Sequence, residues 1–271
     1  MSLLDIFPQR LPIIGMVHLP PLPGSPRWGG DMTAVLRRAL DDAMALAQEG
    51  ADGLLVENYG DLPFLKGPVG QETVAAMAVV VRAVVEATGL PVGVNVLRND
   101  PCAALAVACA AGARFVRTNV HIGAAVTDQG LLEGRAAEAL RYRRWLGCEP
   151  VLLLADVNVK HGAPLGGRSL EETARDAAYR GLADGLIVSG PATGLPPTPE
   201  ELMRVRQAVP DRPLLVGSGL DPSNARDLLS LADGAIVGTS LKQGGRTEAS
   251  VERERVRLLM EAVRQVRAAL G

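Results

Sequence analysis

Short apolar runs alternate with longer amphipathic stretches along the whole chain. Eight of these runs have the length of a buried strand, and they lie at residues 11–19, 53–59, 91–98, 114–122, 150–159, 184–190, 213–219 and 234–240. The stretches between them, such as DMTAVLRRALDDAMALAQEG, space their apolar residues with helical periodicity. Continuous apolar strands separated by single helices predict a parallel sheet whose outer face is covered by helices.

Capping signals agree with this division into strands and helices. Ser169 precedes Glu172 at capping-box spacing, and Asp221 followed by Pro222 predicts a helix that begins there with proline in its first turn. Glycines are expected to close four of the helices, at Gly50, Gly89, Gly112 and Gly147.

Eight strand–helix pairs without a break in composition predict one closed (β/α)8 TIM barrel, a single domain over residues 1–271. The alternative is a doubly wound open sheet, which would normally carry a glycine-rich dinucleotide turn after its first strand. That position holds HLPPLPGSPRWGG, which contains no G-x-G-x-x-G. The barrel is therefore preferred.

Glycines and hydroxyls follow the seventh and eighth strands, in LLVGSGLDPSNARDLL and ADGAIVGTS. Phosphate sites of TIM barrels favour these two strands, and glycine lets backbone N–H groups approach an anion closely. We predict a phosphate site formed by Gly217, Ser218, Gly219, Gly238, Thr239 and Ser240, with Thr193 extending its rim. The alternative is that the glycines only make tight strand-to-helix turns.

Polar residues gather near the ends of the other strands. Predicted catalytic residues are His18, Glu57, His121, Asp156 and Lys160. Predicted substrate-binding residues are Asn95, Arg117, Asn119, Asn158 and His161. Unpaired polar groups are costly inside an apolar barrel, so we expect these side chains to hydrogen-bond around a ligand space. Each one alone could equally be an exposed loop residue.

Two chemistries are open to this set. Glu57 and Asp156 could transfer protons as a carboxylate pair, or could bind a divalent metal together with His18 or His121. The histidine spacing is not of the H-x-H or H-E-x-x-H type. Lys160 is expected to pair with an anionic substrate, because a Schiff-base role would require a desolvated amine and the residue follows the strand at a loop edge.

Composition narrows the partners and the location. The chain is 48% hydrophobic and 21% charged with a formal net charge of −2, which argues against binding nucleic acid. The C-terminal VERERVRLLMEAVRQVRAAL is expected to be a solvated amphipathic helix, and no signal peptide or membrane-spanning segment is predicted. Cys102, Cys109 and Cys148 are expected to be buried reduced thiols, as in a cytoplasmic protein. Peripheral membrane association and homo-oligomer formation stay open.

Several long stretches resemble the BtpA/SgcQ family, and the resemblance spans nearly the whole chain. They are IIGMVHLPPLPGSPRWGG, ADGLLVENYGDLPF, GVNVLRND, RFVRTNVHIGAAVTDQGLLEG, LLADVNVKHGAPLG and LLVGSGLDPSNARDLL. The resemblance implies a phosphate-binding TIM-barrel fold. One branch of that family is associated with photosystem I biogenesis as a membrane-peripheral factor, and another with nucleosidase or sugar metabolism. The roles given above come from residue chemistry and not from the family.

Two functions are therefore expected as alternatives. The first is an enzyme that acts on a phosphorylated small molecule, such as a sugar phosphate or nucleoside derivative, by acid–base lyase, isomerase or glycosidic-bond chemistry. The second is a non-catalytic, membrane-peripheral assembly factor for a membrane protein complex. Ten polar residues directed at one cavity favour the enzyme, since a scaffold does not need them.

Overall fold

Eight parallel strands close into a barrel in the computed structural model, which describes residues 3–270. The strands are β1 (Ile13–His18), β2 (Gly53–Glu57), β3 (Val92–Asn95), β4 (Phe115–Thr118), β7 (Leu152–Asp156), β9 (Gly185–Val188), β10 (Leu214–Val216) and β11 (Gly234–Val237). Their order around the barrel follows the chain, and β1 pairs with β11 to close it. Each strand lies within one of the apolar runs, so the predicted TIM barrel is confirmed.

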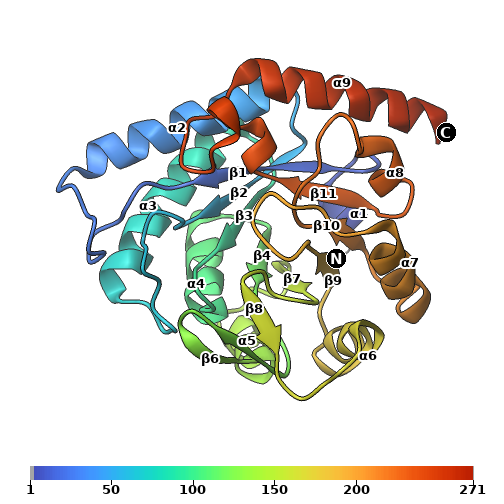
Figure 1. Ribbon diagram of the computed structural model, residues 1–271. Helices are drawn as coiled ribbons and strands as arrows, with labels where there is room; N and C mark the ends of the chain where they lie inside the picture. The colour runs from blue at the N-terminus through green and yellow to red at the C-terminus, as the bar shows by residue number, and fades with distance from the viewer. Residues whose placement is uncertain (1–2, 271) are drawn as a thin grey trace.

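Helices surround the strands on the outside (Figure 1). One helix follows each barrel strand, and these helices are α2 (Met32–Gln48), α3 (Gln71–Thr88), α4 (Pro101–Ala111), α5 (Ala136–Trp145), α6 (Leu170–Arg175, continued by a π-helical turn over Asp176–Arg180), α7 (Pro199–Ala208), α8 (Ala225–Leu229) and α9 (Arg253–Ala269). Two short 3-10 turns, Thr239–Leu241 and Gln243–Gly245, lie between β11 and α9. The capping box from Ser169 to Glu172 begins α6 as predicted.

The N-terminal end of the barrel is closed by a plug. The short helix α1 (Leu3–Ile6) and Phe7 belong to the same buried cluster as the side chains inside the barrel. Phe7 lies 5.9 Å from Phe115, measured between ring centroids. Gly93 makes room for this pair, because a Cβ there would lie 2.1 Å from Cε2 of Phe115. Aromatic packing therefore fills the end of the barrel opposite the predicted site.

A second, three-stranded antiparallel sheet was not predicted. It consists of β5 (Ala124–Thr127), β6 (Gly130–Glu133) and β8 (Gly162–Pro164), with β5 in the centre. Figure 1 shows it in green and yellow-green beside α5. The sheet grows out of the loops that follow β4 and β7, so it adds structure at the carboxyl ends of the barrel strands.

The predicted start of the helix after β10 is wrong. The structure begins α8 at Ala225, with Asn224 as the residue before it. The Asp221 carboxylate accepts hydrogen bonds from the N–H groups of Ser223 (2.8 Å) and Asn224 (3.3 Å). These local bonds hold Asp221 and Pro222 in a turn, because Asp side chains compete for nearby backbone donors.

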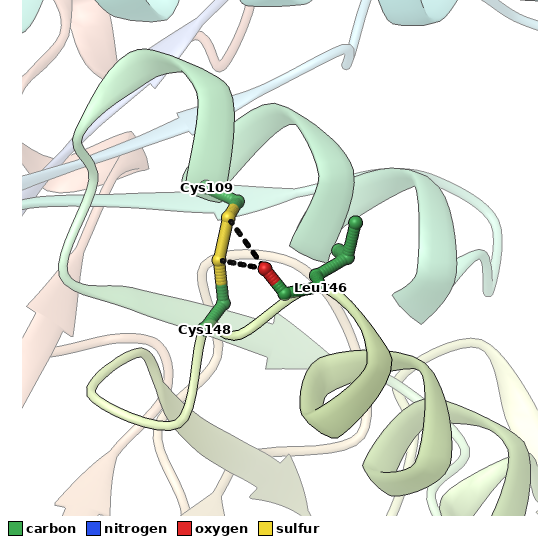
Figure 2. The surroundings of a disulfide bond; sticks show 3 residues. All are labelled: Cys109, Leu146 and Cys148. Carbon is green, nitrogen blue, oxygen red and sulfur yellow. Dashed lines mark hydrogen bonds between the residues drawn. A yellow bond between two sulfur atoms is a disulfide. The ribbon is translucent and has the colours of Figure 1, made fainter.

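The prediction of three reduced thiols is also wrong. Cys109 in α4 and Cys148 in the turn before β7 form a disulfide, with Cα atoms 6.0 Å apart (Figure 2). Both sulfurs lie near the carbonyl oxygen of Leu146, at 4.0 and 3.8 Å. Cys102 remains a free, half-buried thiol, and burial raises its pKa to about 11. Sequence spacing could not show that the fold brings Cys109 and Cys148 together across 39 residues.

The C-terminal segment forms the amphipathic helix predicted for it. Val256, Leu259, Met260 and Val263 of α9 are buried, while its many charged side chains face outward. Across residues 3–270, no helix combines the length and the apolar character needed to cross a membrane.

Candidate active site

A cavity of about 440 Å³ opens at the carboxyl ends of the barrel strands. It is lined by residues from most of the barrel strands and the loops that follow them: Met16, His18, Glu57, Tyr59, Leu62, Phe64, Leu97, Arg98, Arg117, Asn119, Asp128, Lys160, His161, Thr193, Gly194, Gly217, Ser218, Gly219, Gly238, Thr239 and Ser240. This volume suits a small ligand. Both groups of sequence-predicted residues, the glycine loops and the polar strand ends, therefore contribute to one cavity.

The two glycine loops form one wall of that cavity. Gly219 has a φ of +69°, and a Cβ there would lie 2.1 Å from the backbone nitrogen of Pro196. A Cβ on Gly217 would lie 2.3 Å from Oγ of Ser189, so both glycines are required by close packing against the loop after β9. The N–H of Gly217 donates to the Val188 carbonyl at 2.8 Å. Within this loop, Ser218 and Gly219 are therefore the residues whose N–H groups could face an anion.

The hydroxyls of these loops mostly hold the loops to one another. Ser218 donates to the Leu195 carbonyl (2.7 Å) and accepts from the Gly190 N–H (3.1 Å). Ser240 donates to the Leu220 carbonyl at 2.7 Å. The hydroxyls of these two serines are thus used structurally, which corrects the expectation that they are donors for an anion. Thr239 lies 3.0 Å from the hydroxyl of Thr247 and can share its proton.

Glu57 lines the same cavity at the end of β2, next to His18. Register pairs Glu57 with His18 of β1 and with Asn95 of β3. Asn95 donates to Oε2 of Glu57 at 2.6 Å, while Oε1 lies 3.7 Å from Nε2 of His18. Burial, followed by Lys242 and Lys160, lowers the pKa of His18 well below 6.5. His18 is therefore neutral at pH 7, and Glu57 keeps one oxygen free of strong partners for proton transfer.

Asp156 does not serve beside Glu57 as a second free carboxylate. Its two oxygens accept from Nη2 and Nε of Arg117 at 2.9 and 3.0 Å. Asn119 donates to the same carboxylate at 2.8 Å. All three side chains are buried, and Arg117 and Asn119 also line the cavity. Because three donors occupy its oxygens, Asp156 is a positioning residue, which corrects the prediction of a carboxylate pair.

Lys160 reaches into the cavity instead of pairing at its edge. Its Nζ donates to the carbonyl of Gly217 at 3.0 Å, which places the amine beside the first glycine loop. Arg98 donates to the backbone carbonyl of Lys160 at 2.5 Å. Burial, and next the charge of Arg117, lower the pKa of Lys160 to about 8. Lys160 is thus partly buried and its amine is more desolvated than its place after the strand suggested, while pairing with an anionic substrate stays a prediction.

Six of the predicted residues lie at the rim of the cavity or outside its lining: His161 and Thr193 at the rim, and Asn95, His121, Asp156 and Asn158 outside the lining. His121 is buried elsewhere, with Nε2 2.8 Å from the carbonyl of Gly181, and burial lowers its pKa. With Asn158, it lines a smaller cavity of about 40 Å³. His161 and Thr193 lie at the rim, where the Thr193 N–H and hydroxyl contact Nε2 of His161 at 3.3 and 3.0 Å. Beyond Asn119 the strand has ended, so the alternation that predicted His121 no longer applies.

Several lining residues were missed by the sequence reasoning. Tyr59 lies two positions after Glu57, just beyond the end of β2, so extending the strand alternation by one step would have found it. Its ring lies 4.8 Å from His18 and 6.4 Å from Phe64, between centroids. Arg98 and Asp128 come from loops, and Asp128 lies in the turn between β5 and β6. No periodic signal identifies such loop residues.

The metal alternative finds limited support in the side chains. Among residues 3–270, no three His, Cys, Asp or Glu side chains are grouped so that they could hold a metal ion. Glu57 and His18 are neighbours, but Asp156 is occupied by Arg117 and His121 faces Gly181. The side chains considered from the sequence, Glu57 and Asp156 with either His18 or His121, are therefore not grouped as metal ligands.

Comparison with known folds agrees with the barrel. Orotidine 5'-phosphate decarboxylase from Pyrococcus horikoshii superposes with a TM-score of 0.58 at 16% identity, covering 93% of this chain and 99% of that one. Thiamine phosphate pyrophosphorylase from Pyrococcus furiosus gives 0.57 at 15% identity, covering 94% and 96%. At such low identity, these similarities establish the fold alone.

Sequence relatives are much closer. The photosystem I biogenesis protein BtpA of Synechocystis is 48% identical over 97% of this chain and 91% of its own. An uncharacterized protein from Thermococcus kodakarensis is 46% identical over 96% and 97%. The model of the BtpA family matches residues 9–265. This chain therefore belongs to the BtpA family.

Proposed function

We propose that this protein is an enzyme that binds a phosphorylated small molecule in the mouth of the barrel and acts on it by proton transfer. The observation that carries the proposal is the sharing of one cavity by the two glycine loops and by Glu57, Arg117 and Lys160. A phosphate beside the loops would leave the rest of the ligand directed toward Glu57. This is the arrangement by which TIM barrels combine a phosphate site with catalysis.

The charges around the cavity suit an anionic ligand. Arg98, Arg117 and Lys160 bring positive charge, whereas Glu57 and Asp128 bring negative charge. Asp156 already neutralises Arg117, so Arg98 and Lys160 supply the attraction that a phosphate would use. Loop N–H groups would then hold the anion where side-chain hydroxyls are engaged elsewhere.

Glu57 is the residue best placed to move a proton. It faces the cavity, Asn95 fixes its orientation, and neutral His18 lies alongside. A carboxylate held in this way can act as a general base in lyase, isomerase or glycosidic-bond chemistry. The rings of Tyr59 and Phe64 provide an apolar side for the remainder of a sugar phosphate or nucleoside derivative.

Thermal unfolding with a panel of ligands tests the binding step. Inorganic phosphate, ribose 5-phosphate and AMP are compared with ribose and adenosine, with and without Mg²⁺. A ligand at 100 times its dissociation constant stabilises the fold by about 2.7 kcal/mol, and phosphorylated ligands should do so selectively. If no phosphorylated compound shifts the transition more than its unphosphorylated partner, the phosphate site is refuted.

A glycine pair provides the matched control. A side chain at Gly238 would begin 3.0 Å from Cε1 of His18, whereas Gly29 has open space around its Cβ position. Gly238→Val should remove the shift caused by phosphorylated ligands, and Gly29→Val should retain it. Equal shifts in both variants would place the phosphate elsewhere.

A membrane-peripheral assembly factor is the second candidate, because a relative named for photosystem I biogenesis is 48% identical to this chain. Co-sedimentation with liposomes and capture of membrane complexes would support this function. Retention of both after Glu57→Gln and Lys160→Met would separate it from the enzyme, since a scaffold does not use those side chains. In the enzyme proposal the protein acts in the cytoplasm and needs no membrane.

A further inference from the structure

The three lysines of the chain, Lys66, Lys160 and Lys242, have three different environments. Lys66 is exposed, and Lys242 is fully buried against the carboxylate of Asp42. Lys160 lies in the cavity, among cationic neighbours and beside a backbone carbonyl. We propose that the amine of Lys160 is a nucleophile that forms an imine with a carbonyl group of the phosphorylated substrate. This inference rests on the proposed function.

The position of the amine is the first argument. Lys160 follows β7, and its side chain crosses to the loop after β10, where Nζ meets the Gly217 carbonyl at 3.0 Å. The amine is therefore adjacent to the proposed phosphate wall. A substrate with its phosphate at Ser218 and Gly219 would present the neighbouring carbon atoms to Nζ.

The hydrogen-bond partner of the amine is the second argument. A carbonyl oxygen can accept a hydrogen bond from a neutral amine, and the nitrogen lone pair then stays free. A carboxylate partner would instead favour the charged form, which is the arrangement of Lys242 and Asp42. The contact with Gly217 is thus compatible with a nucleophilic amine.

The neighbouring cations are the third argument. Burial, followed by the charges of Arg117 and Arg98, lowers the pKa of Lys160 to about 8, although the carboxylates of Asp156 and Glu57 oppose that shift. About one amine in ten is then neutral at pH 7, compared with fewer than about one in a thousand for an ordinary lysine with a pKa of about 10.4. Desolvation and a nearby cation are the means by which proteins activate a lysine amine.

The covalent step balances without a further reagent. The nitrogen lone pair attacks the carbonyl carbon, a C–N bond forms, and the carbonyl electron pair moves to oxygen. Two protons reach that oxygen, both of them originally on the ammonium nitrogen, and the oxygen leaves as water. The ammonium group and the carbonyl compound thus yield a protonated imine and one molecule of water.

The imine gives Glu57 a defined role. A protonated imine withdraws electrons from the adjacent carbon, so a base can remove a proton from that carbon more easily. Glu57 lines the same cavity as Lys160, with Asn95 holding its carboxylate. The substrate class that fits both residues is a phosphorylated aldehyde or ketone that undergoes isomerisation, dehydration or aldol-type cleavage.

Reductive trapping tests this proposal directly. The full chain is incubated with glycolaldehyde phosphate or dihydroxyacetone phosphate, reduced with sodium cyanoborohydride at pH 7, and mapped by peptide mass spectrometry. Lys160 should carry the adduct, and its initial rate should exceed that of exposed Lys66 by at least tenfold. Inorganic phosphate should slow labelling of Lys160 and leave Lys66 unchanged. Labelling of Lys66 without labelling of Lys160 between pH 7 and 9 overturns the proposal.

Two arginine substitutions serve as controls. Lys160→Arg keeps the positive charge but cannot form an imine, so the adduct should be lost while the thermal shift caused by phosphate is retained. Lys66→Arg should leave the Lys160 adduct unchanged. If the Lys160→Arg variant still carries one adduct, at another residue of the cavity, the assignment of the nucleophile to Lys160 is wrong.

The same measurements separate this inference from the proposed function. If phosphorylated ligands stabilise the protein but Lys160 forms no adduct, phosphate binding stands and the nucleophile is refuted. If unphosphorylated glycolaldehyde labels Lys160 equally fast and phosphate does not compete, the amine is reactive but the phosphate site is refuted.

Discussion

Lys242 is fully buried and Lys160 is partly buried, and the two lysines have different surroundings. Lys242 is 0% exposed and donates to Oδ2 of Asp42 at 3.0 Å, in the packing between α2 and the segment before α9. Asp42 also accepts from the Val251 N–H at 2.7 Å. Lys160 meets a carbonyl oxygen and two arginines in an open cavity. Burial lowers the pKa of both lysines, but only Lys242 has a carboxylate that opposes the shift by direct contact.

We interpret this difference as the one between a structural lysine, Lys242, and the proposed nucleophile, Lys160. A buried ion pair holds its place because removing either partner leaves an uncompensated charge. A desolvated lysine that faces other cations lowers stability, and such groups concentrate at functional sites. Burial alone would have ranked Lys242 first, whereas the identity of the partner points to Lys160.

Removing each lysine should give the largest contrast. Lys242→Met removes the ammonium partner of buried Asp42, which keeps Arg38 at 3.3 Å as a cation, and should lower the free energy of unfolding by about 3 kcal/mol. Lys160→Met removes a cation that faces two others and should leave stability unchanged or raise it by about 1 kcal/mol. Urea unfolding at pH 7 measures both. Equal losses in the two variants would show that the two lysines do not differ as described.

The carboxylates of the cavity extend the contrast. Asp156→Ala leaves the buried guanidinium of Arg117 without its carboxylate partner and should lower the free energy of unfolding by about 3 kcal/mol. Glu57→Gln keeps an oxygen for the Asn95 amide and should change stability by less than about 1 kcal/mol. Once a substrate is found, the loss of turnover relative to the loss of stability should be larger for Glu57→Gln than for Asp156→Ala. A Glu57→Gln variant as unstable as Asp156→Ala would make Glu57 structural.

The pH dependence of stability sharpens the assignment of Lys160. Its folded pKa of about 8 lies below the usual value of about 10.4, so the unfolded chain binds more protons between these limits. Stability should therefore rise with pH from about 8 to about 10.4, by about 3 kcal/mol from this group. The difference between wild type and Lys160→Met, measured by urea unfolding at each pH, isolates the contribution. A difference that stays flat across this window would show that the amine is not desolvated.

The smallest effect is expected at the loop that receives Lys160. Ser218→Ala removes the hydrogen bonds with Leu195 and Gly190 and should destabilise the protein by about 1–2 kcal/mol. Affinity for phosphorylated ligands should change less than about threefold, since this hydroxyl faces the neighbouring loop. Calorimetric titration tests it, and a tenfold loss of affinity would return Ser218 to the anion site.

The sequence predicted the barrel well because strand length, helical periodicity and caps repeat along the chain. The sequence also predicted that Glu57, Arg117 and the glycine loops lie at one end of the barrel, since parallel strands place their carboxyl ends together. The sequence could not predict which side chains pair with one another at that end of the barrel. The Asp156–Arg117 pair depends on the adjacency of β4 and β7 across an inserted hairpin, and Cys109 meets Cys148 only once α4 and α5 pack. Such contacts follow from three-dimensional packing rather than from local periodicity.

The plug formed by α1 and Phe7 closes the barrel at its N-terminal end. Ligand, water and product then enter and leave through the same opening, at the rim where the β5–β6 turn contributes Asp128. Because the cavity has this one opening, a water molecule released by imine formation must pass the bound substrate or leave after it.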